Sequence, residues 1–180
     1  MPYILNAKSR LKLKHKLHDM CINLCNHLRE NHILVQKGVK EKENKRGKVV
    51  GIKPIWDLPV CACYCSAHCI NAEGYSHRML KCHQLLEKEL LKYGNVGKAP
   101  SKGVLAINHD PWPLGQCAEQ HAANRLLYEA NEKPTPKGKG RNPGTQFNAI
   151  YVGPAYRVKT RQFMPPCKNC KAIFNSATIL

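Results

Sequence analysis

The chain has 180 residues, of which 43% are hydrophobic, which is enough for one buried core with an appended helix. Lysine and arginine number 29 against 12 acidic residues, a formal net charge of +17. This excess favours a polyanionic partner, although a solvated basic surface is the alternative. The N-terminus lacks the apolar segment of a signal peptide, and no apolar run reaches the roughly 18–20 residues of a membrane span. We therefore expect no membrane partner, and ten cysteines that are free or bound to metal.

Residues 8–30 are predicted to form an amphipathic helix, because apolar side chains recur at steps of three and four: Leu13, Leu17, Cys21, Leu24 and Leu28. Basic side chains decorate its start, where positive charge opposes the helix dipole: Lys8, Arg10, Lys12, Lys14 and Lys16. These charges either face a phosphate backbone or are solvated. Cys21 and Cys25 lie one turn apart and could ligate a metal, although packing in the core is the commoner role of such thiols.

The next segment is polar and charged over 36–48 and predicts a linker or exposed loop, followed by a short strand at 49–52. Four cysteines then fall within nine residues: Cys61, Cys63, Cys65 and Cys69. Their alternating spacing fits the paired ligands of a structural zinc site poorly. The segment is therefore either a second metal site or a buried strand or helix start.

Helices and strands are expected to alternate over the rest of the chain. Apolar periodicity predicts a helix over 70–93 that ends at Gly94, a strand over 103–108, and a helix from 116 or 117 to about 130. A basic loop over 131–145, a strand over 147–152 and a last helix from Pro166 almost to the end follow. A thiol motif opens each of the last two helices and follows a strand, so both helix starts should converge on one point.

The two motifs read Cys117-Ala118-Glu119 and Pro166-Cys167-Lys168-Asn169-Cys170. Cys167 and Cys170 share one face of a first helical turn, so both sulfurs can reach one ion, and Cys117 supplies a third ligand. Three thiolates leave the fourth position of Zn²⁺ open for water, and Glu119 is placed to move that water's protons rather than to ligate. The alternatives are a redox dithiol and a zinc ribbon, but a ribbon needs a second cysteine pair where Cys117 stands alone.

Together the motifs resemble the cytidine-deaminase-like superfamily, whose signature is His- or Cys-x-Glu followed by Pro-Cys-x-x-Cys. The run over 111–124 is most similar to the YwqJ-type deaminases, which occur as C-terminal domains of bacterial polymorphic toxins. The resemblance covers residues 75–180. It implies zinc on Cys117, Cys167 and Cys170, with Glu119 as the catalytic acid and base.

The resemblance also implies an α/β fold, the three-layer α/β/α cytidine-deaminase-like arrangement with a small mixed sheet, to which this chain adds an N-terminal basic helix. The superfamily core has a β-hairpin before the first motif, and the segment at 49–52 could supply one of its strands. The implied division of the chain is an N-terminal region over 1–70, with helix, linker and Cys-rich segment, and a zinc-dependent deaminase domain over 71–180.

Substrate contacts are expected near the motifs. Asn108, His109 and Trp112 could contact the sugar or base of a flipped nucleotide, although Asn108 could cap a turn and Trp112 could belong to the core. Further cations could hold a phosphate backbone: Lys137, Lys139, Arg141, Arg157, Lys159 and Arg161. The net charge favours nucleic acid, single- or double-stranded, over a free nucleoside, whereas the preference for cytosine over adenine comes from the resemblance alone.

Three functions are open at this point. The first is a monomeric zinc-dependent deaminase that converts cytosine to uracil in nucleic acid, with DNA the favoured polymer. The others are a free nucleoside or nucleotide deaminase, and a non-catalytic basic nucleic-acid-binding protein with a structural zinc. The expected location is cytoplasmic or nuclear, or a target cell that a secreted toxin enters, in which case an immunity protein would be a partner.

Overall fold

The computed structural model describes residues 5–30, 34–36, 42–43, 49–50, 52–54, 59–77, 79–98, 113–132, 147–157, 160, 162–174 and 178–180. In these residues the chain is a mixed α/β structure built on a five-stranded antiparallel sheet. Two further sheets have two strands each. Among the helices of the described ranges, none is long and apolar enough to cross a membrane.

The helices of the described part are α1 (Ala7–Glu30), α2 (Gln84–Leu91), α4 (Ala118–Glu132) and α6 (Lys168–Ile173). The five-stranded sheet contains β5 (Pro59–Cys65), β6 (Ile70–Tyr75), β7 (Ile150–Val152), β8 (Ala155–Arg157) and β9 (Phe163–Met164). The two small sheets pair β1 (Leu34–Gln36) with β4 (Ile52–Pro54) and β2 (Lys42–Glu43) with β3 (Val49–Val50). The expected strand at 49–52 therefore belongs to the small sheets, and the hairpin before the first thiol motif is β5–β6.

Strand β5 lies at the centre of the five-stranded sheet, with β6 on one side and β7 and β8 on the other. Successive side chains of a strand point to opposite faces, so Cys61, Cys63 and Cys65 share one face while Val60 and Ala62 share the other. All five are fully buried. The Cys-rich segment is thus a buried strand, and the exposed Cys69 lies in the turn that follows it.

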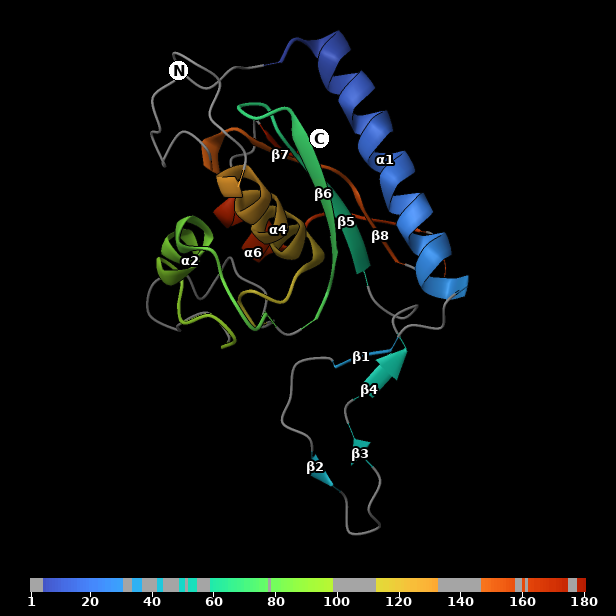
Figure 1. The fold of residues 1–180 in the computed structure, drawn as a ribbon, viewed down its shortest axis with the longest axis vertical. Helices are drawn as coiled ribbons and strands as arrows, with labels where there is room; N and C mark the ends of the chain where they lie inside the picture. The colour runs from blue at the N-terminus through green and yellow to red at the C-terminus, as the bar shows by residue number, and fades with distance from the viewer. Residues whose placement is uncertain are drawn as a thin grey trace.

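Helices cover both faces of this sheet (Figure 1). The predicted N-terminal helix is confirmed as α1, whose Leu17, Cys21 and Cys25 are buried against Val60 and Ala62. The two thiols of α1 are therefore core residues. The opposite face of the sheet is covered by α4, with α2 and α6 on the same side. The domain boundary expected at residue 70 falls at the first residue of β6, which is hydrogen-bonded to β5.

Two expectations about the elements are wrong. Residues 70–75 form β6 rather than the first part of a helix over 70–93, because Ile70, Ala72 and Gly74 alternate with more exposed neighbours, and α2 begins only at Gln84. The sheet is not mixed, because every pair of named strands in it is antiparallel, as short hairpin connections favour. The only parallel pairing recorded in the described residues is an isolated bridge from Val152 to Ile179.

The other helical predictions differ mainly at their ends. The helix expected from 116 or 117 is confirmed as α4, which starts at Ala118. The last helix is shorter than expected and spans only Lys168–Ile173. The predicted strand over 103–108 lies outside the described residues. Of the basic loop expected over 131–145, residues 131 and 132 belong to the end of α4, and the rest lies outside the described residues.

Gly74 allows α4 to lie directly on β6. A methyl group at this position would come within 2.4 Å of the Ala122 backbone nitrogen and 2.8 Å of the His121 Cβ. Neither atom belongs to the end of a flexible side chain, so the helix itself would have to move. We expect Gly74→Ala to lower the free energy of unfolding by about 3 kcal/mol or more, measured by urea denaturation.

Gly97 provides the control for this substitution. It has a φ of 82°, but a methyl group there would meet no atom within 4 Å. Gly97→Ala should therefore cost only about 1–2 kcal/mol, the strain of a left-handed conformation. An equal effect of the two substitutions would contradict a close contact between α4 and β6.

Candidate metal centre

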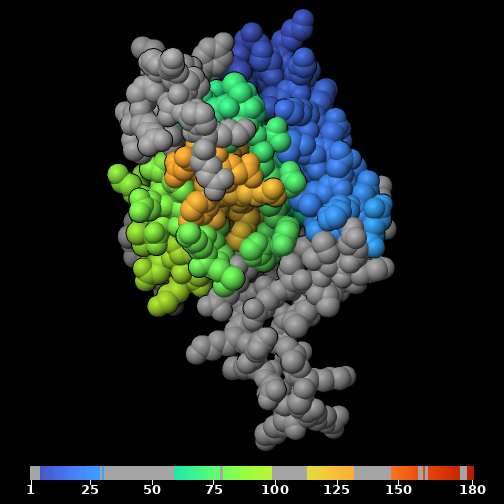
Figure 2. Space-filling view, in the orientation of Figure 1, coloured from blue at the N-terminus to red at the C-terminus, as the bar shows by residue number. Residues whose placement is uncertain are grey.

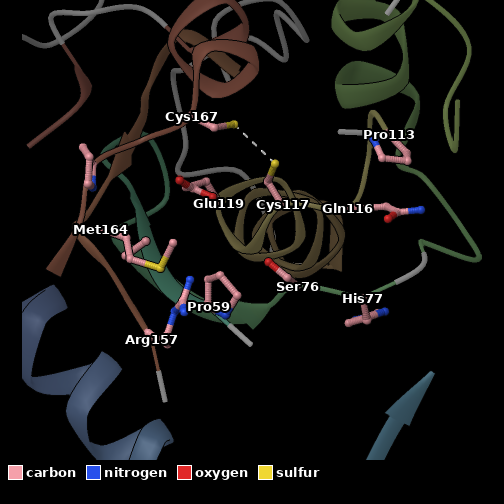
Figure 3. A pocket seen from close by; sticks show the side chains of 12 residues that line it. Pro59, Ser76, His77, Pro113, Gln116, Cys117, Glu119, Arg157, Met164 and Cys167 are labelled. Atoms are coloured by element: carbon pink, nitrogen blue, oxygen red, sulfur yellow. Dashed lines mark hydrogen bonds between the residues drawn. The ribbon is translucent and has the colours of Figure 1, made fainter. Parts of the chain in front are cut away.

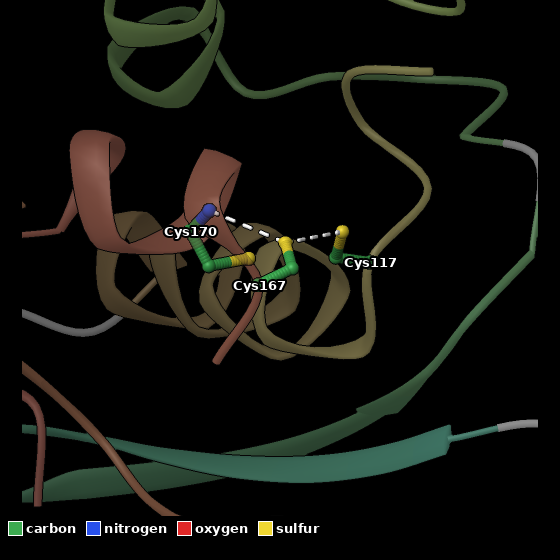
Figure 4. A group of neighbouring side chains, drawn as sticks. All are labelled: Cys117, Cys167 and Cys170. Atoms are coloured by element: carbon green, nitrogen blue, oxygen red, sulfur yellow. Dashed lines mark hydrogen bonds between the residues drawn. The ribbon is translucent and has the colours of Figure 1, made fainter. Parts of the chain in front are cut away.

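Three thiols converge where α4 and α6 begin. The sulfur atoms of Cys117, Cys167 and Cys170 all lie within 4.8 Å of one another, which makes them a group that could hold a metal ion. Cys117 Sγ and Cys167 Sγ are 3.4 Å apart. Figure 4 shows the three side chains turned toward one another, one from the segment before α4 and two from the start of α6. The structure thus brings together the three ligands that the motif spacing predicts.

Local hydrogen bonds hold the sulfur atoms in place. Cys167 is the N-cap of α6, with an extended backbone (φ −64°, ψ 164°), and its sulfur accepts the backbone N–H of Cys170 at 3.4 Å. Gln120, which is fully buried in α4, donates from Nε2 to Cys170 Sγ at 3.6 Å. Its Oε1 in turn accepts the backbone N–H of Gly115 at 2.6 Å. The amide of Gln120 therefore ties the loop before Cys117 to the thiol of Cys170.

The protonation of these thiols favours a bound cation. The pKa of Cys167 is lowered, first by hydrogen bonds from the other two thiols. The pKa of Cys117 is raised, chiefly because it donates to Cys167, and burial raises that of Cys170. Without a cation, one negative charge is thus shared by three sulfur atoms. A metal ion would allow all three to ionise, and soft thiolate ligands suit zinc, copper(I) or iron–sulfur chemistry.

A pocket of about 240 Å³ opens beside the cluster, and Cys117 and Cys167 both line it. Figure 3 shows these thiols with Glu119 at one side of the pocket. Pro59, Met164 and Arg157 lie together at another side, where β5 begins and β8 and β9 end. Proline and methionine supply apolar surface there, and Arg157 supplies the positive charge.

Glu119 is the acidic group of the pocket, and its side chain is only 5% exposed. Burial raises the pKa of this carboxyl to about 7. Its position is fixed by the first turn of α4, where its own carbonyl accepts the thiol proton of Cys63 at 3.7 Å. Glu119 is not one of the three residues grouped as potential metal ligands, but it lines the same pocket as Cys117 and Cys167.

Comparison of the chain with protein-family models, curated proteins and solved structures gives no match. The site is therefore interpreted from its own geometry.

Of the residues predicted to contact substrate, the structure places one. Arg157, at the end of β8, lines the pocket. The others lie outside the described residues: Asn108, His109, Trp112, Lys137, Lys139, Arg141, Lys159 and Arg161.

The pocket also contains residues that the sequence did not indicate. Ser76 and His77 follow β6 and line it, but a helix was expected at that point. The His77 ring packs on His121 of α4 with a centroid distance of 3.6 Å, and His121 Nε2 lies 3.0 Å from the His77 carbonyl oxygen. Burial lowers the pKa of His121 to about 4, so this imidazole is neutral at physiological pH. Gln116, directly before the first thiol motif, completes this wall.

Proposed function

We propose that this protein is a zinc-dependent hydrolytic deaminase that converts cytosine to uracil in nucleic acid. One observation carries the proposal: three thiols that could hold one metal ion lie beside a buried carboxyl group, and the carboxyl and two of the thiols line one pocket. A cluster with a purely structural metal would need neither the pocket nor the acid. If the ion is Zn²⁺, three sulfur ligands would leave its fourth position for water.

Each residue of the site then has a chemical role. Cys117, Cys167 and Cys170 would hold Zn²⁺, which when bound supplies a water molecule activated for attack on C4 of the ring. Glu119 takes a proton from the attacking water and delivers one to N3. It then takes the proton that remains on the oxygen added at C4 and transfers it to the amino group, which leaves as ammonia, so that cytosine and water give uracil and ammonia.

The pocket suits a single planar ring. Its volume, about 240 Å³, is below the range of about 300–1,000 Å³ that is usual for drug-sized ligands. Pro59, Pro113 and Met164 offer apolar surface to the ring faces, and Ser76 and Gln116 offer polar groups to its edge. A base would have to leave its stack to enter, which is how enzymes reach ring atoms in nucleic acid.

Charge favours a polymer over a free base. Arg157 lies at the pocket and suits a phosphate group, and the chain as a whole carries a net charge of +17. The fold is consistent with a deaminase-like three-layer arrangement, because α1 covers one face of the sheet and α4 the other, and the β5–β6 hairpin precedes the first motif.

The second candidate function is deamination of free cytidine, and the small size of the pocket favours it. Such an enzyme would act on the nucleoside with little dependence on salt, whereas a protein that holds a phosphate backbone loses affinity steeply as salt is raised.

The proposal is tested by incubating the zinc-loaded protein with single-stranded DNA, duplex DNA, RNA and cytidine. We expect C-to-U changes on sequencing of at least one polymer, release of ammonia, and loss of both after chelation of the metal. Turnover of cytidine alone would establish the second candidate. If protein with one zinc per chain converted none of the four substrates, the three thiols would form a structural metal site rather than a catalytic one.

A further inference from the structure

Helix α1 presents a row of lysines to solvent. Lys8, Lys12 and Lys16 recur every four residues, so at about 100° per residue they lie within about 80° of one another around the helix. All three side chains are exposed. The helix has no acidic residue before Asp19. The nearby Arg10 differs, because its Nη2 donates to the Ile179 carbonyl oxygen at 3.1 Å and so helps to tie the C-terminal residues to α1.

Local helix energetics do not account for this row. Positive charge in the first turns opposes the helix dipole, and like charges four residues apart repel each other. The first turn of α1 contains no acid. The ion pairs recorded among the described residues involve Lys92 and Arg125 but none of these three lysines. Lys16 Nζ lies 6.0 Å from the centroid of the Tyr64 ring, a contact that does not neutralise its charge. A bound polyanion would remove both costs at once.

The packing of α1 indicates which polyanion fits. A helix that lies in a membrane interface inserts an apolar face into the lipid. The apolar face of α1 is already occupied, because Leu13, Leu17 and Leu28 are buried against the sheet. On the solvent side of the helix, the large apolar side chain recorded as exposed is Leu11. A rigid basic rod without a free apolar face suits a phosphate backbone rather than a lipid surface.

The spacing of the lysines also matches nucleic acid. Lys8 and Lys16 are about 12 Å apart along the helix axis at a rise of about 1.5 Å per residue. Duplex DNA carries about one negative charge per 1.7 Å of its axis, so that length of duplex carries about seven phosphates. Three lysines on one side of α1 can therefore each have a phosphate partner.

We propose that the exposed lysines of α1 at positions 8, 12 and 16 form a docking surface for a nucleic-acid backbone that is separate from the pocket. Figure 2 shows α1 at the surface along one edge of the molecule, and in Figure 1 α1 and α4 lie on opposite faces of the sheet. The surface binds without reading sequence, since lysine contacts to phosphate carry no base information. The inference does not depend on the proposed deamination, because it concerns binding alone.

The test compares two variants with equal loss of charge. In the first, all three docking lysines become glutamine: Lys8→Gln, Lys12→Gln and Lys16→Gln. In the control, three exposed lysines elsewhere are changed: Lys88→Gln, Lys98→Gln and Lys171→Gln. Binding of a random-sequence duplex of about 30 base pairs is followed by fluorescence anisotropy between about 50 and 200 mM salt.

We expect the first variant to bind at least about tenfold more weakly at low salt, and the slope of log K against log salt to fall by about 2.7, at about 0.9 per lost contact. The control should keep nearly the full slope. Equal effects in both variants would show a diffuse charge effect and overturn the docking surface, as would an unchanged slope in the first variant. The proposal would also be overturned if the first variant lost binding to phosphatidylserine vesicles while its DNA binding stayed unchanged.

Folding is checked independently. Because the three lysines oppose the helix dipole and repel one another, the first variant should melt at the same temperature as the wild type or higher. The double variant Lys12→Gln and Lys16→Gln provides a milder test, with an expected loss of slope of about 1.8.

Discussion

Replacing Glu119 by glutamine should abolish deamination while leaving the metal bound. Glutamine keeps the size of the side chain and can still form hydrogen bonds in the pocket, but it cannot take and return protons. Proton transfer by a positioned side chain contributes about 10²- to 10⁴-fold, and here one group serves several transfers, so we expect a rate at least about 10³-fold lower. The rate of C-to-U conversion and the zinc content per chain are the two measurements.

The two readouts separate catalysis from metal binding. Glu119 is not among the three thiols that could hold the ion, so Glu119→Gln should retain one zinc per chain. Glu129→Gln is the matched control, because Glu129 lies in the same helix, where it pairs with Arg125 at 2.9 Å in contact with solvent. Near-normal activity of Glu119→Gln would refute the assigned mechanism. A loss of zinc in parallel with activity would show instead that Glu119 supports the metal.

The group of three thiols could be predicted from the sequence because most of its geometry is local. Cys167 and Cys170 are held by one turn of helix, and their relative position follows from the spacing alone. Cys117 could be added because it opens the preceding helix. Only the spatial proximity of the two helix starts had to be inferred, from the expectation that both follow strands of one sheet.

The walls of the pocket could not be predicted in this way. Arg157, Met164 and His77 belong to separate strands or their ends, and they meet only because β5 pairs with β6 on one side and β8 on the other. No periodicity within a strand specifies its neighbours. The error at β6 has a related cause. The alternating pattern over 70–75 is followed along the chain by the helical pattern of Leu86 and Leu90, and the two patterns were interpreted as one helix.

The Cys-rich strand shows the limit of interpreting residue type without spacing. Four cysteines in nine residues suggest a metal, yet strict alternation places Cys61, Cys63 and Cys65 in the sheet core, where their neighbours are apolar. The spacing argued against paired ligands, and the buried-strand alternative was the one that the fold confirms. For the thiols of this chain, spacing was therefore more informative than their number.

Cys170→Ser is expected to have the largest effect on stability. Its sulfur is fully buried, accepts from Gln120 Nε2 at 3.6 Å, and would be one of three metal ligands. Serine is a far weaker ligand, so bound zinc should fall from one per chain to nearly none. Structural zinc can contribute about 10–16 kcal/mol in zinc-finger peptides, which lack a core. This chain has its own core, so we expect a smaller loss of about 4 kcal/mol, or about 8–16 °C in melting temperature.

Cys69→Ser is the control that assigns this loss to the metal rather than to any thiol. Cys69 is exposed and follows the central strand, outside the cluster, so zinc content and melting temperature should not change. Chelation of the wild type should lower its melting temperature to that of Cys170→Ser, because both treatments leave the same helix starts without an ion between them. A Cys170→Ser protein that retains full zinc would show that the ion lies elsewhere. If chelation and substitution were instead additive, the buried thiol would stabilise the core independently of the metal.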